Sequence, residues 1–319
     1  MTNAAGGKSR IDAIDLARTI ALGAMAVYHF TWDLEFFGHV ERGLTLSPGW
    51  KLFARCIASS FLILAGISLV LAHVDGIRWA SFAKRLAMVA GAAALISIAT
   101  WFAFPDAFIH FGILHQIALA SLLGLAFLRL PWPAIALVAG GVLALPFFWR
   151  SGVFDHPALW WTGLAPVPRH SNDYVPVFPW FAAFLAGMAL AKGWKAHAPQ
   201  AWRQRLGTLS VPAWWTWPGR HSLAVYLVHQ PVLIGLVWAW TQVFPPTMTV
   251  EQAQPGCQVQ CLESRNEDFC RAYCACLLDA LDAKGILSPV MSGRASEEQL
   301  RQTAEERDIC LARQVGQTR

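Results

Sequence analysis

Long apolar stretches alternate with short polar segments along the first three quarters of the chain. Seven of these stretches approach the length of about 20 residues that an α-helix needs to cross a bilayer. They cover residues 11–30, 51–74, 86–104, 112–130, 132–149, 177–191 and 222–243. The fifth and sixth are short and contain proline, so a re-entrant segment is the alternative for each. The pattern predicts an all-α fold, a polytopic membrane helix bundle of about seven spans.

The character of the chain changes after Pro245 and Pro246, because no further apolar stretch of membrane length follows. Six of the seven cysteines lie beyond this point. A polar, cysteine-rich segment after the last span belongs outside the bilayer, since its polar groups need water. We therefore expect two domains, a membrane domain of residues 1–245 and a cysteine-rich helical tail of residues 246–319.

The tail shows the signals of a small helical hairpin. Residues 266–284 follow an amphipathic pattern with the period of a helix, and Gly285 comes next as a helix terminator. Ser296 and Gln299 form a capping box, in which each side chain bonds to the backbone N–H of the other residue. This box begins a second predicted helix, so two helices are expected to pack against each other.

The cysteines of the tail are spaced for cross-linking. Cys257 and Cys261 are four residues apart, as are Cys270 and Cys274, so the members of each pair share one face of a helix. Disulfides persist in oxidising compartments, and the even number of cysteines in the tail fits such bonds. We expect disulfides here. Reduced thiols and a metal site are the alternatives, and the lack of histidine in the tail makes the metal site weak.

Composition agrees with a membrane protein. Apolar residues make up 55% of the chain and charged residues 14%, and the mean hydropathy is +0.41. The net charge of +5 is spread over several loops rather than gathered in one basic patch. This distribution argues against nucleic acid as a partner and leaves the lipid bilayer.

The distribution of lysine and arginine predicts the orientation, since cytoplasmic loops carry an excess of both. With the amino terminus in the cytoplasm, the loops on that side carry eleven of these residues and the outer loops carry five. The first span is expected to stay in place, because no cleavable signal pattern precedes it. Seven spans then put the tail on the far side, as expected for a bacterial inner-membrane protein with a periplasmic tail.

The first predicted span carries ionisable residues along one stripe. Arg18 and His29 lie within about 20° of each other around the helix and about 16 Å apart along it, with Leu22 and Met25 between them. Ionisable groups inside a membrane helix usually face a cavity or a partner. We therefore expect this stripe to line a passage that connects the inner and outer faces of the bundle.

Two histidine patterns near the outer face are candidates for acid–base chemistry. His29 has Asp33 one turn later, and a carboxylate at this spacing can fix the tautomer of a histidine and raise its base strength. In the last span, Tyr226 and His229 share a polar stripe beside Pro231, where the helix is expected to open. We predict His29 and Asp33 as catalytic residues. The alternatives are a helix cap at His29 and a packed kink at Pro231.

Basic residues gather at the inner ends of several spans. Arg18 and Arg220 flank the first and last spans, and Lys84 and Arg85 enter the third. An anionic cofactor, such as a phosphorylated nucleotide, would bind at such a positive mouth. The orientation rule explains this charge as well, so both interpretations stay open from the residues alone.

Several motifs together resemble one known family. They are the segments 10–18, 25–33, 61–68, 112–115, 175–180 and 219–229. In these segments the chain resembles the bacterial members of the heparan-alpha-glucosaminide N-acetyltransferase catalytic-domain family, over about residues 8–243 and without the tail. Asp15 and Arg18 match the Asp-x-x-Arg opening of that family, and Tyr226 and His229 match its last-span pattern.

The resemblance implies a polytopic acyltransferase that moves an acyl group from cytosolic acyl-CoA, in particular acetyl-CoA, to a sugar on the far side. The implied acceptor is a saccharide or a glycolipid, and thioester transfer needs no metal. On this basis we predict Asp15, Arg18, Arg220 and Tyr226 as residues that bind the cofactor, and His229 as a further catalytic residue.

Other assignments remain open at this point. The catalytic base is one of His29, His39, His115 and His229. The charged stripe would also suit a transporter, as a path for a substrate or for protons. A third function is electron transfer, with histidines of separate spans as ligands of a b-type haem.

Overall fold

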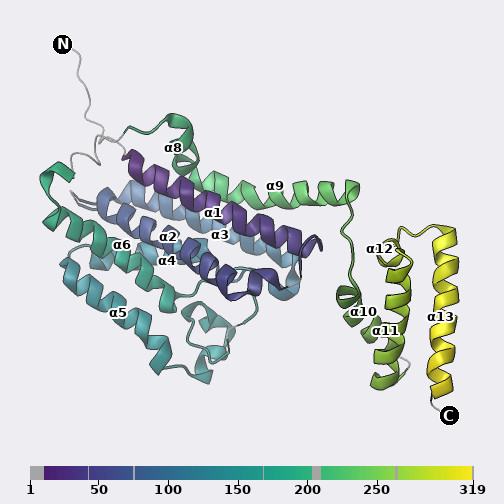
Figure 1. The fold of residues 1–319 in the computed structure, drawn as a ribbon. Coiled ribbons are helices and arrows are strands. Elements are labelled where there is room, and N and C mark those ends of the chain that lie inside the picture. Colours follow the sequence, from purple (N-terminus) through teal and green to yellow (C-terminus); the bar gives the residue numbers. More distant parts are fainter. Residues whose placement is uncertain are drawn as a thin grey trace. The chain divides into compact units, whose positions relative to one another are not determined.

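The computed structural model describes residues 11–41, 43–74, 76–167, 169–202, 210–262 and 265–317. Within these residues the fold is all-α, as predicted (Figure 1). The helices up to residue 243 are α1 (Asp12–Phe36), α2 (Pro48–Ala72), α3 (Trp79–Ala103), α4 (Ile113–Gly124), α5 (Trp132–Phe148), α6 (Val177–His197), α8 (Ala213–Arg220) and α9 (Ser222–Val243). The tail contains α10 (Val250–Leu262), α11 (Glu267–Ala283), α12 (Leu287–Met291) and α13 (Glu297–Gln317).

The described chain forms two compact units. The first contains the residues up to Tyr28 together with Pro48–Pro231, and the second contains His29–Ser47 together with the chain from Val232 onwards. The units therefore divide within α1 and α9. The boundary predicted at residue 245 lies inside the second unit, and the separation of a membrane domain from a tail stays a prediction.

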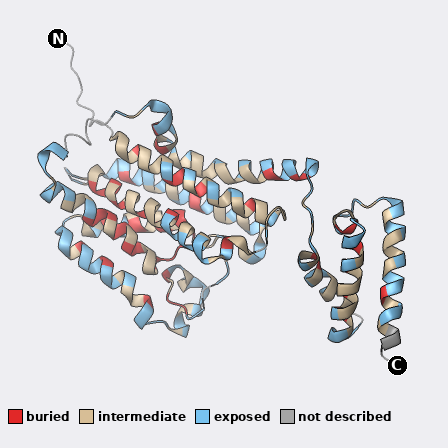
Figure 2. Cartoon of the chain, viewed as in Figure 1, coloured by how far each residue is buried: buried red, intermediate tan, exposed pale blue. Residues whose placement is uncertain are grey.

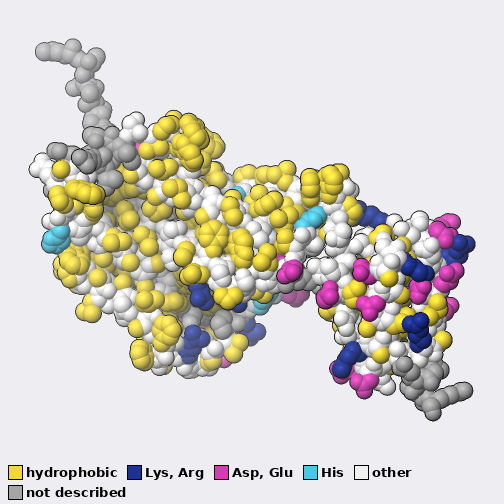
Figure 3. All heavy atoms as spheres, viewed as in Figure 1, with side chains coloured by type: hydrophobic (Ala, Val, Ile, Leu, Met, Phe, Trp, Pro, Cys, Tyr) yellow, Lys and Arg dark blue, Asp and Glu magenta, His cyan; other side chains and the backbone are white. Residues whose placement is uncertain are grey.

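Several described helices have the character of membrane spans. α2, α3, α6 and α9 are long and apolar enough to cross a membrane. α4 and α5 are apolar but shorter, so the number of seven spans stays a prediction. Hydrophobic side chains cover much of the visible face of the first unit (Figure 3), where a water-soluble protein would carry mostly polar groups. In Figure 2, α3 shows few buried residues, which fits a helix that faces lipid.

The core of the first unit forms where α6 packs along α2 and α5. Gly66 of α2 and Gly187 of α6 bring the two helices together: a Cβ atom at Gly66 would overlap the carbonyl oxygen of Phe184, and one at Gly187 would overlap that of Ile63. Close backbone approach at small residues is the usual way in which membrane helices associate. Leu62, Phe184, Leu185 and Met188 fill the centre of this core and are fully buried.

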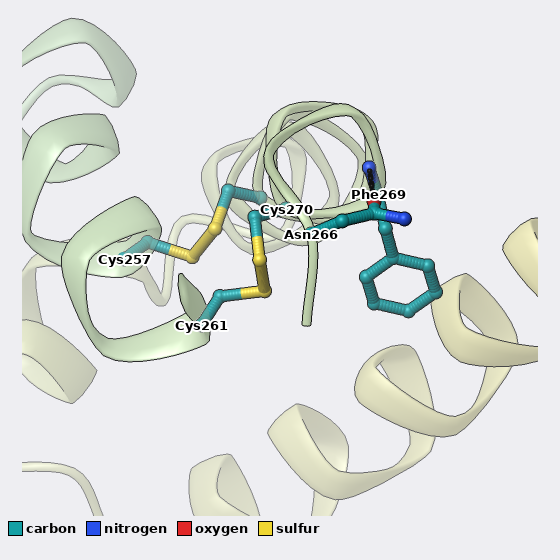
Figure 4. Close-up of a disulfide and its surroundings, with 6 residues drawn as sticks. Cys257, Cys261, Asn266, Phe269 and Cys270 are labelled. Atoms are coloured by element: carbon teal, nitrogen blue, oxygen red, sulfur yellow. Dashed lines mark hydrogen bonds between the residues drawn. A yellow bond between two sulfur atoms is a disulfide. The ribbon is translucent and has the colours of Figure 1, made fainter. Parts of the chain in front are cut away.

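The tail is held together by three disulfides, which confirms that prediction. Cys257–Cys274 and Cys261–Cys270 join α10 to α11, and Cys276–Cys310 joins α11 to α13. Figure 4 shows the two bonds between α10 and α11 side by side. Ala253, Leu278, Leu281, Ile286 and Leu287 form a small buried core beside them.

The helix boundaries of the tail follow the predicted signals, but the predicted hairpin is incomplete. Asn266 caps α11 by accepting a hydrogen bond from the Phe269 N–H over 2.9 Å (Figure 4), and the capping box of Ser296 and Gln299 begins α13. The prediction of two helices missed α10 and the short α12. α10 contains Pro255, a residue that argues against a helix, yet two disulfides fasten this segment to α11.

Candidate active site

A cavity of about 450 Å³ opens between helices of the first unit. Arg18, Arg85 and Arg220 supply its positive lining, and His221 lies beside them. The rest of the lining is mainly apolar, with Phe61, Leu64, Ala65, Met88, Val89, Ile113, Leu114, Ile117, Leu223, Ala224 and Tyr226 among its residues. None of the lining residues is a carboxylate. The cavity therefore combines a positive wall with an apolar one.

The positive and apolar parts lie at different depths along the helices. Leu114 packs on Ala92 and Ala93 of α3, two turns beyond Arg85, which is about 11 Å along the helix axis. Tyr226 belongs to the same apolar contact and lies six residues after Arg220 in the chain. The cavity thus runs from the arginines towards Ile113, Leu114 and Tyr226.

Asp15 positions two of the arginines. This carboxyl group is 1% exposed. Its Oδ1 atom lies 2.8 Å from Nη1 of Arg18, and its Oδ2 atom lies 3.6 Å from Nε of Arg220. Arg18 also donates to Oγ of Ser68 on α2 over 2.6 Å, and Arg220 pairs with Asp12 over 3.0 Å. A carboxylate between two guanidinium groups fixes the directions in which their remaining N–H groups point.

A close contact holds the end of α8 against α1. The backbone N–H of Gly219 donates to Oγ1 of Thr19 over 2.9 Å, and that hydroxyl lies 3.1 Å from the carbonyl oxygen of Asp15. A Cβ atom at Gly219 would overlap the same carbonyl oxygen. Only glycine fits this position, and the contact places Arg220 next to Asp15.

Arg85 provides the positive charge that the carboxylates do not neutralise. It makes no hydrogen bond or ion pair with any residue that the structure describes. It also lines a second cavity of about 170 Å³, together with His73, Arg78, Ser81 and Ser121. An unneutralised guanidinium at the junction of two cavities without carboxylates is suited to bind an anion.

The structure brings together the four residues predicted to bind a cofactor. Arg18, Arg220 and Tyr226 line the larger cavity, and Asp15 contacts both arginines. Their roles stay predictions. Sequence reasoning missed Ser68, whose only signal is a hydroxyl in an apolar span.

In the described part of the first unit, no passage follows the stripe of α1, in contrast to the prediction. Leu22 and Met25, which separate Arg18 from His29, are 3% and 4% exposed and pack with Ile57 in an apolar cluster. Arg18 is the one α1 residue that lines the cavity. Beyond Arg18 the cavity follows α2, α3, α4 and α9 instead, because apolar side chains fill the space along α1. His29 and the buried Asp33 belong to the second unit.

Hydrogen bonds fix the tautomers of two candidate histidines, His229 and His39. Nδ1 of His229 lies 2.5 Å from the carbonyl oxygen of Tyr226, so Nδ1 carries the proton and Nε2 the lone pair in the neutral ring. Nε2 of His39 lies 2.9 Å from Thr241 Oγ1, whose proton goes to the carbonyl of Val237, so here Nε2 is the donor. Of the two rings, His229 has the tautomer with its lone pair on Nε2.

His115 has both ring nitrogens engaged. Nδ1 accepts from the Gly112 N–H over 3.2 Å, and Nε2 donates to Oγ of Ser97 over 3.2 Å. The Ser97 hydroxyl in turn donates to the carbonyl of Ile109 over 2.6 Å. This chain of bonds ties α3 to the start of α4. Both ring nitrogens of His115 thus serve a structural connection.

Asp173 is a further polar residue beside the cavity, and it was not among the predicted site residues. It lies in the segment before α6, and its Oδ2 atom accepts a hydrogen bond of 2.8 Å from the N–H of Ile113, the first residue of α4. Burial raises the pKa of this carboxyl group to about 6, while the bond from Ile113 lowers it. Its signal in the sequence is an acidic residue directly before an apolar span.

The chain matches a known family. A family model described as heparan-alpha-glucosaminide N-acetyltransferase, catalytic, matches residues 10–231. This chain belongs to that family. The match contains every residue that lines the larger cavity, together with Asp173, and ends before the tail. Among curated proteins and solved structures, none matches the chain. Membership of this family confirms the resemblance noted in the sequence.

Proposed function

We propose that this protein is an integral membrane acyltransferase that moves an acetyl or other acyl group from cytosolic acyl-CoA to a hydroxyl or amine of an extracytoplasmic sugar. The proposal includes a bacterial inner membrane, a cytoplasmic amino terminus and a periplasmic tail. One observation carries it: the cavity combines Arg18, Arg85 and Arg220 with an apolar wall and no carboxylate, in a chain of an acetyltransferase family.

The chemistry of acyl-CoA fits both parts of the cavity. Its phosphate groups would meet the guanidinium groups, which bind phosphate through paired, charge-assisted hydrogen bonds. Its thin pantetheine arm would follow the apolar lining towards Tyr226. Arg18, Arg85, Arg220 and Tyr226 would hold the donor, and Asp15 would keep two of the arginines in place.

The acceptor must lose a proton as it attacks the thioester carbon. The candidate histidine bases for this step are His29, which has Asp33 one turn later, and His229. The tautomer of His229 supports it as a base, since its Nδ1–H bond leaves the lone pair on Nε2. For the tail, three disulfides support an oxidising compartment and therefore a location outside the cytoplasm.

A labelling experiment tests this function directly. Membranes from cells that make the full-length protein are incubated with acetyl-CoA that carries the label on its acetyl group, and membranes without the protein serve as the control. The proposal predicts label covalently attached to a saccharide only when the protein is present. Protein-dependent uptake of a sugar without any acylated product would contradict the proposal and would favour a transporter.

A further inference from the structure

Asp173 lies in an outer connecting segment and forms a hydrogen bond at the apolar end of the cavity. Its Oδ2 atom accepts from the N–H of Ile113, whose side chain lines the cavity. Its charge also interacts with Tyr226, a second lining residue, which comes from α9. The hydrogen bond to Ile113 therefore places this carboxyl group beside the end of the cavity that lies away from the arginines.

The local packing leaves one carboxylate oxygen available. A Cβ atom at Gly112 would overlap Oδ2 of Asp173, so glycine is required for the approach of the carboxyl group to α4. The other oxygen, Oδ1, makes no hydrogen bond with a residue that the structure describes, and no described cation pairs with the carboxylate. The residue keeps part of its surface accessible. Asp173 is thus held in place through Oδ2, and its Oδ1 can accept a further hydrogen bond.

Three other titratable groups, His110, His115 and Tyr174, lie in the segments around Asp173. Both nitrogens of His115 on α4 are engaged by Gly112 and Ser97. The ring of His110 packs against Trp160 and Tyr174, and burial lowers its pKa. The hydroxyl of Tyr174 donates to the carbonyl of Trp160 over 2.7 Å.

We propose that Asp173 is the general base of the acyl transfer and accepts the proton of the attacking sugar hydroxyl or amine through Oδ1. This inference rests on the proposed acyltransferase function. As the proton moves to Asp173, the acceptor oxygen or nitrogen bonds to the thioester carbon and the carbon–sulfur bond breaks. The protonated Asp173 then returns its proton to the departing thiolate. The products are the acylated sugar and the free thiol of CoA, and the carboxylate is regenerated.

The pH dependence of the full-length enzyme in membranes tests this assignment. Asp173→Asn keeps an oxygen that can accept from Ile113 but cannot accept the proton of the acceptor. Asp173→Glu keeps the carboxylate, and Asp155→Asn is the matched control, since Asp155 is exposed and lies in an outer connecting segment. The probes are acetyl-CoA with a labelled acetyl group and glucosamine, added to membranes that also hold the cell's own glycans.

We expect Asp173→Asn to lower kcat by about 10²- to 10⁴-fold at neutral pH, with the KM for acetyl-CoA nearly unchanged. The ratio of the wild-type rate to the rate of Asp173→Asn cancels any titration of the acceptor. This ratio should rise with pH and level off above about 6, where the carboxyl group is ionised. Asp173→Glu should recover part of the rate, and Asp155→Asn should behave as the wild type.

Three results would overturn the inference. The first is a ratio that does not change with pH, and the second is a rate for Asp173→Asn within about threefold of the wild-type rate. The third is a transfer rate whose dependence on pH is lost in His29→Gln or His229→Gln but kept in Asp173→Asn. If the wild type transfers no label, the acyltransferase function fails and the inference fails with it. If the wild type is active and Asp173→Asn is unaffected, only the role of Asp173 is wrong.

Discussion

The carboxylate of Asp15 lies 2.8 Å from the guanidinium group of Arg18, on the next turn of the same helix. The same carboxylate reaches Arg220 at the end of α8, so one buried acidic residue orients two arginines that lie about 200 residues apart in the chain. A pre-oriented pair of guanidinium groups loses less entropy when an anion binds than two free side chains would. The relationship explains how the cavity can favour a phosphorylated ligand.

Replacement of Arg18 should weaken the binding of the donor. Arg18→Ala removes a charge-assisted contact of about 1.5–3 kcal/mol, so the KM for acetyl-CoA should rise by about 10- to 100-fold with little change in kcat. Steady-state kinetics measure both constants, and Arg129→Ala, at an exposed arginine outside the cavity, is the control. Equal losses in kcat and kcat/KM would contradict the assigned role.

Gly219→Ala should destabilise the first unit. The new Cβ atom would overlap the backbone of Asp15, so the end of α8 would have to move away from α1, at a cost of about 1–3 kcal/mol. Gly91→Ala is the matched control, because a Cβ atom at Gly91 meets nothing within 4 Å. Thermal unfolding of the full-length protein should show a lower Tm for Gly219→Ala only. Equal Tm values for the two variants would count against the close contact.

The sequence predicts the helices better than it predicts the cavity. The apolar lengths locate the four described helices that are long and apolar enough to cross a membrane, and the basic residues near the predicted span ends include Arg18, Arg85 and Arg220. The predicted path along α1 fails because helical periodicity shows which residues share a face but not what packs against that face. Leu22 and Met25 share the stripe, and Ile57 of α2 covers them.

Asp173 and α10 show two other limits of the sequence. Asp173 is separated by 60 residues from Ile113, and their hydrogen bond depends on how the segment before α6 folds back on α4. No local pattern contains that information. α10 includes Pro255, which lowers its helix propensity, and its disulfides to α11 override this preference.

The three disulfides of the tail should contribute unequally to its stability. Cys276–Cys310 spans 34 residues, whereas Cys261–Cys270 spans 9. Loop-closure entropy predicts losses of about 4 and about 2.5 kcal/mol when each pair is replaced by serine. The measurement is the urea concentration at which the tail of the full-length protein becomes sensitive to trypsin, with Cys56→Ser as the control. The opposite order of sensitivity would contradict this ranking.

The location of the tail has a separate test. A membrane-impermeant maleimide applied to cells with a permeable outer envelope should label the tail cysteines only after mild reduction. Disulfides block the thiols before reduction, and a periplasmic tail is accessible without lysis. Labelling without reduction would argue against the disulfides, and labelling only after lysis would argue against a periplasmic tail.

Asp173→Asn should stabilise the protein at high pH while it impairs catalysis. Burial raises the pKa of Asp173 from 3.8 to about 6 in the folded state, so folding favours the protonated group. The protonated carboxyl group therefore makes its whole contribution to stability below the pKa that Asp173 has in the unfolded chain. This contribution is lost as the pH rises through about 6. At pH 8 the free energy of unfolding of Asp173→Asn should exceed that of the wild type by an amount on the order of 1–2 kcal/mol, and its Tm should be higher. The two Tm values should converge near pH 4. A less stable variant at pH 8 would contradict the raised pKa.

The most direct test of the account is the binding of two donors to the purified full-length protein in lipid nanodiscs. Acetyl-CoA carries phosphate groups, whereas S-acetylpantetheine presents the same thioester without them. If the arginines of the cavity bind the phosphates, Arg18→Ala should weaken the affinity for acetyl-CoA by about 10-fold or more and leave that for S-acetylpantetheine almost unchanged. An equal effect on both ligands, or no effect on either, would contradict the claim that this cavity is the acyl-CoA site.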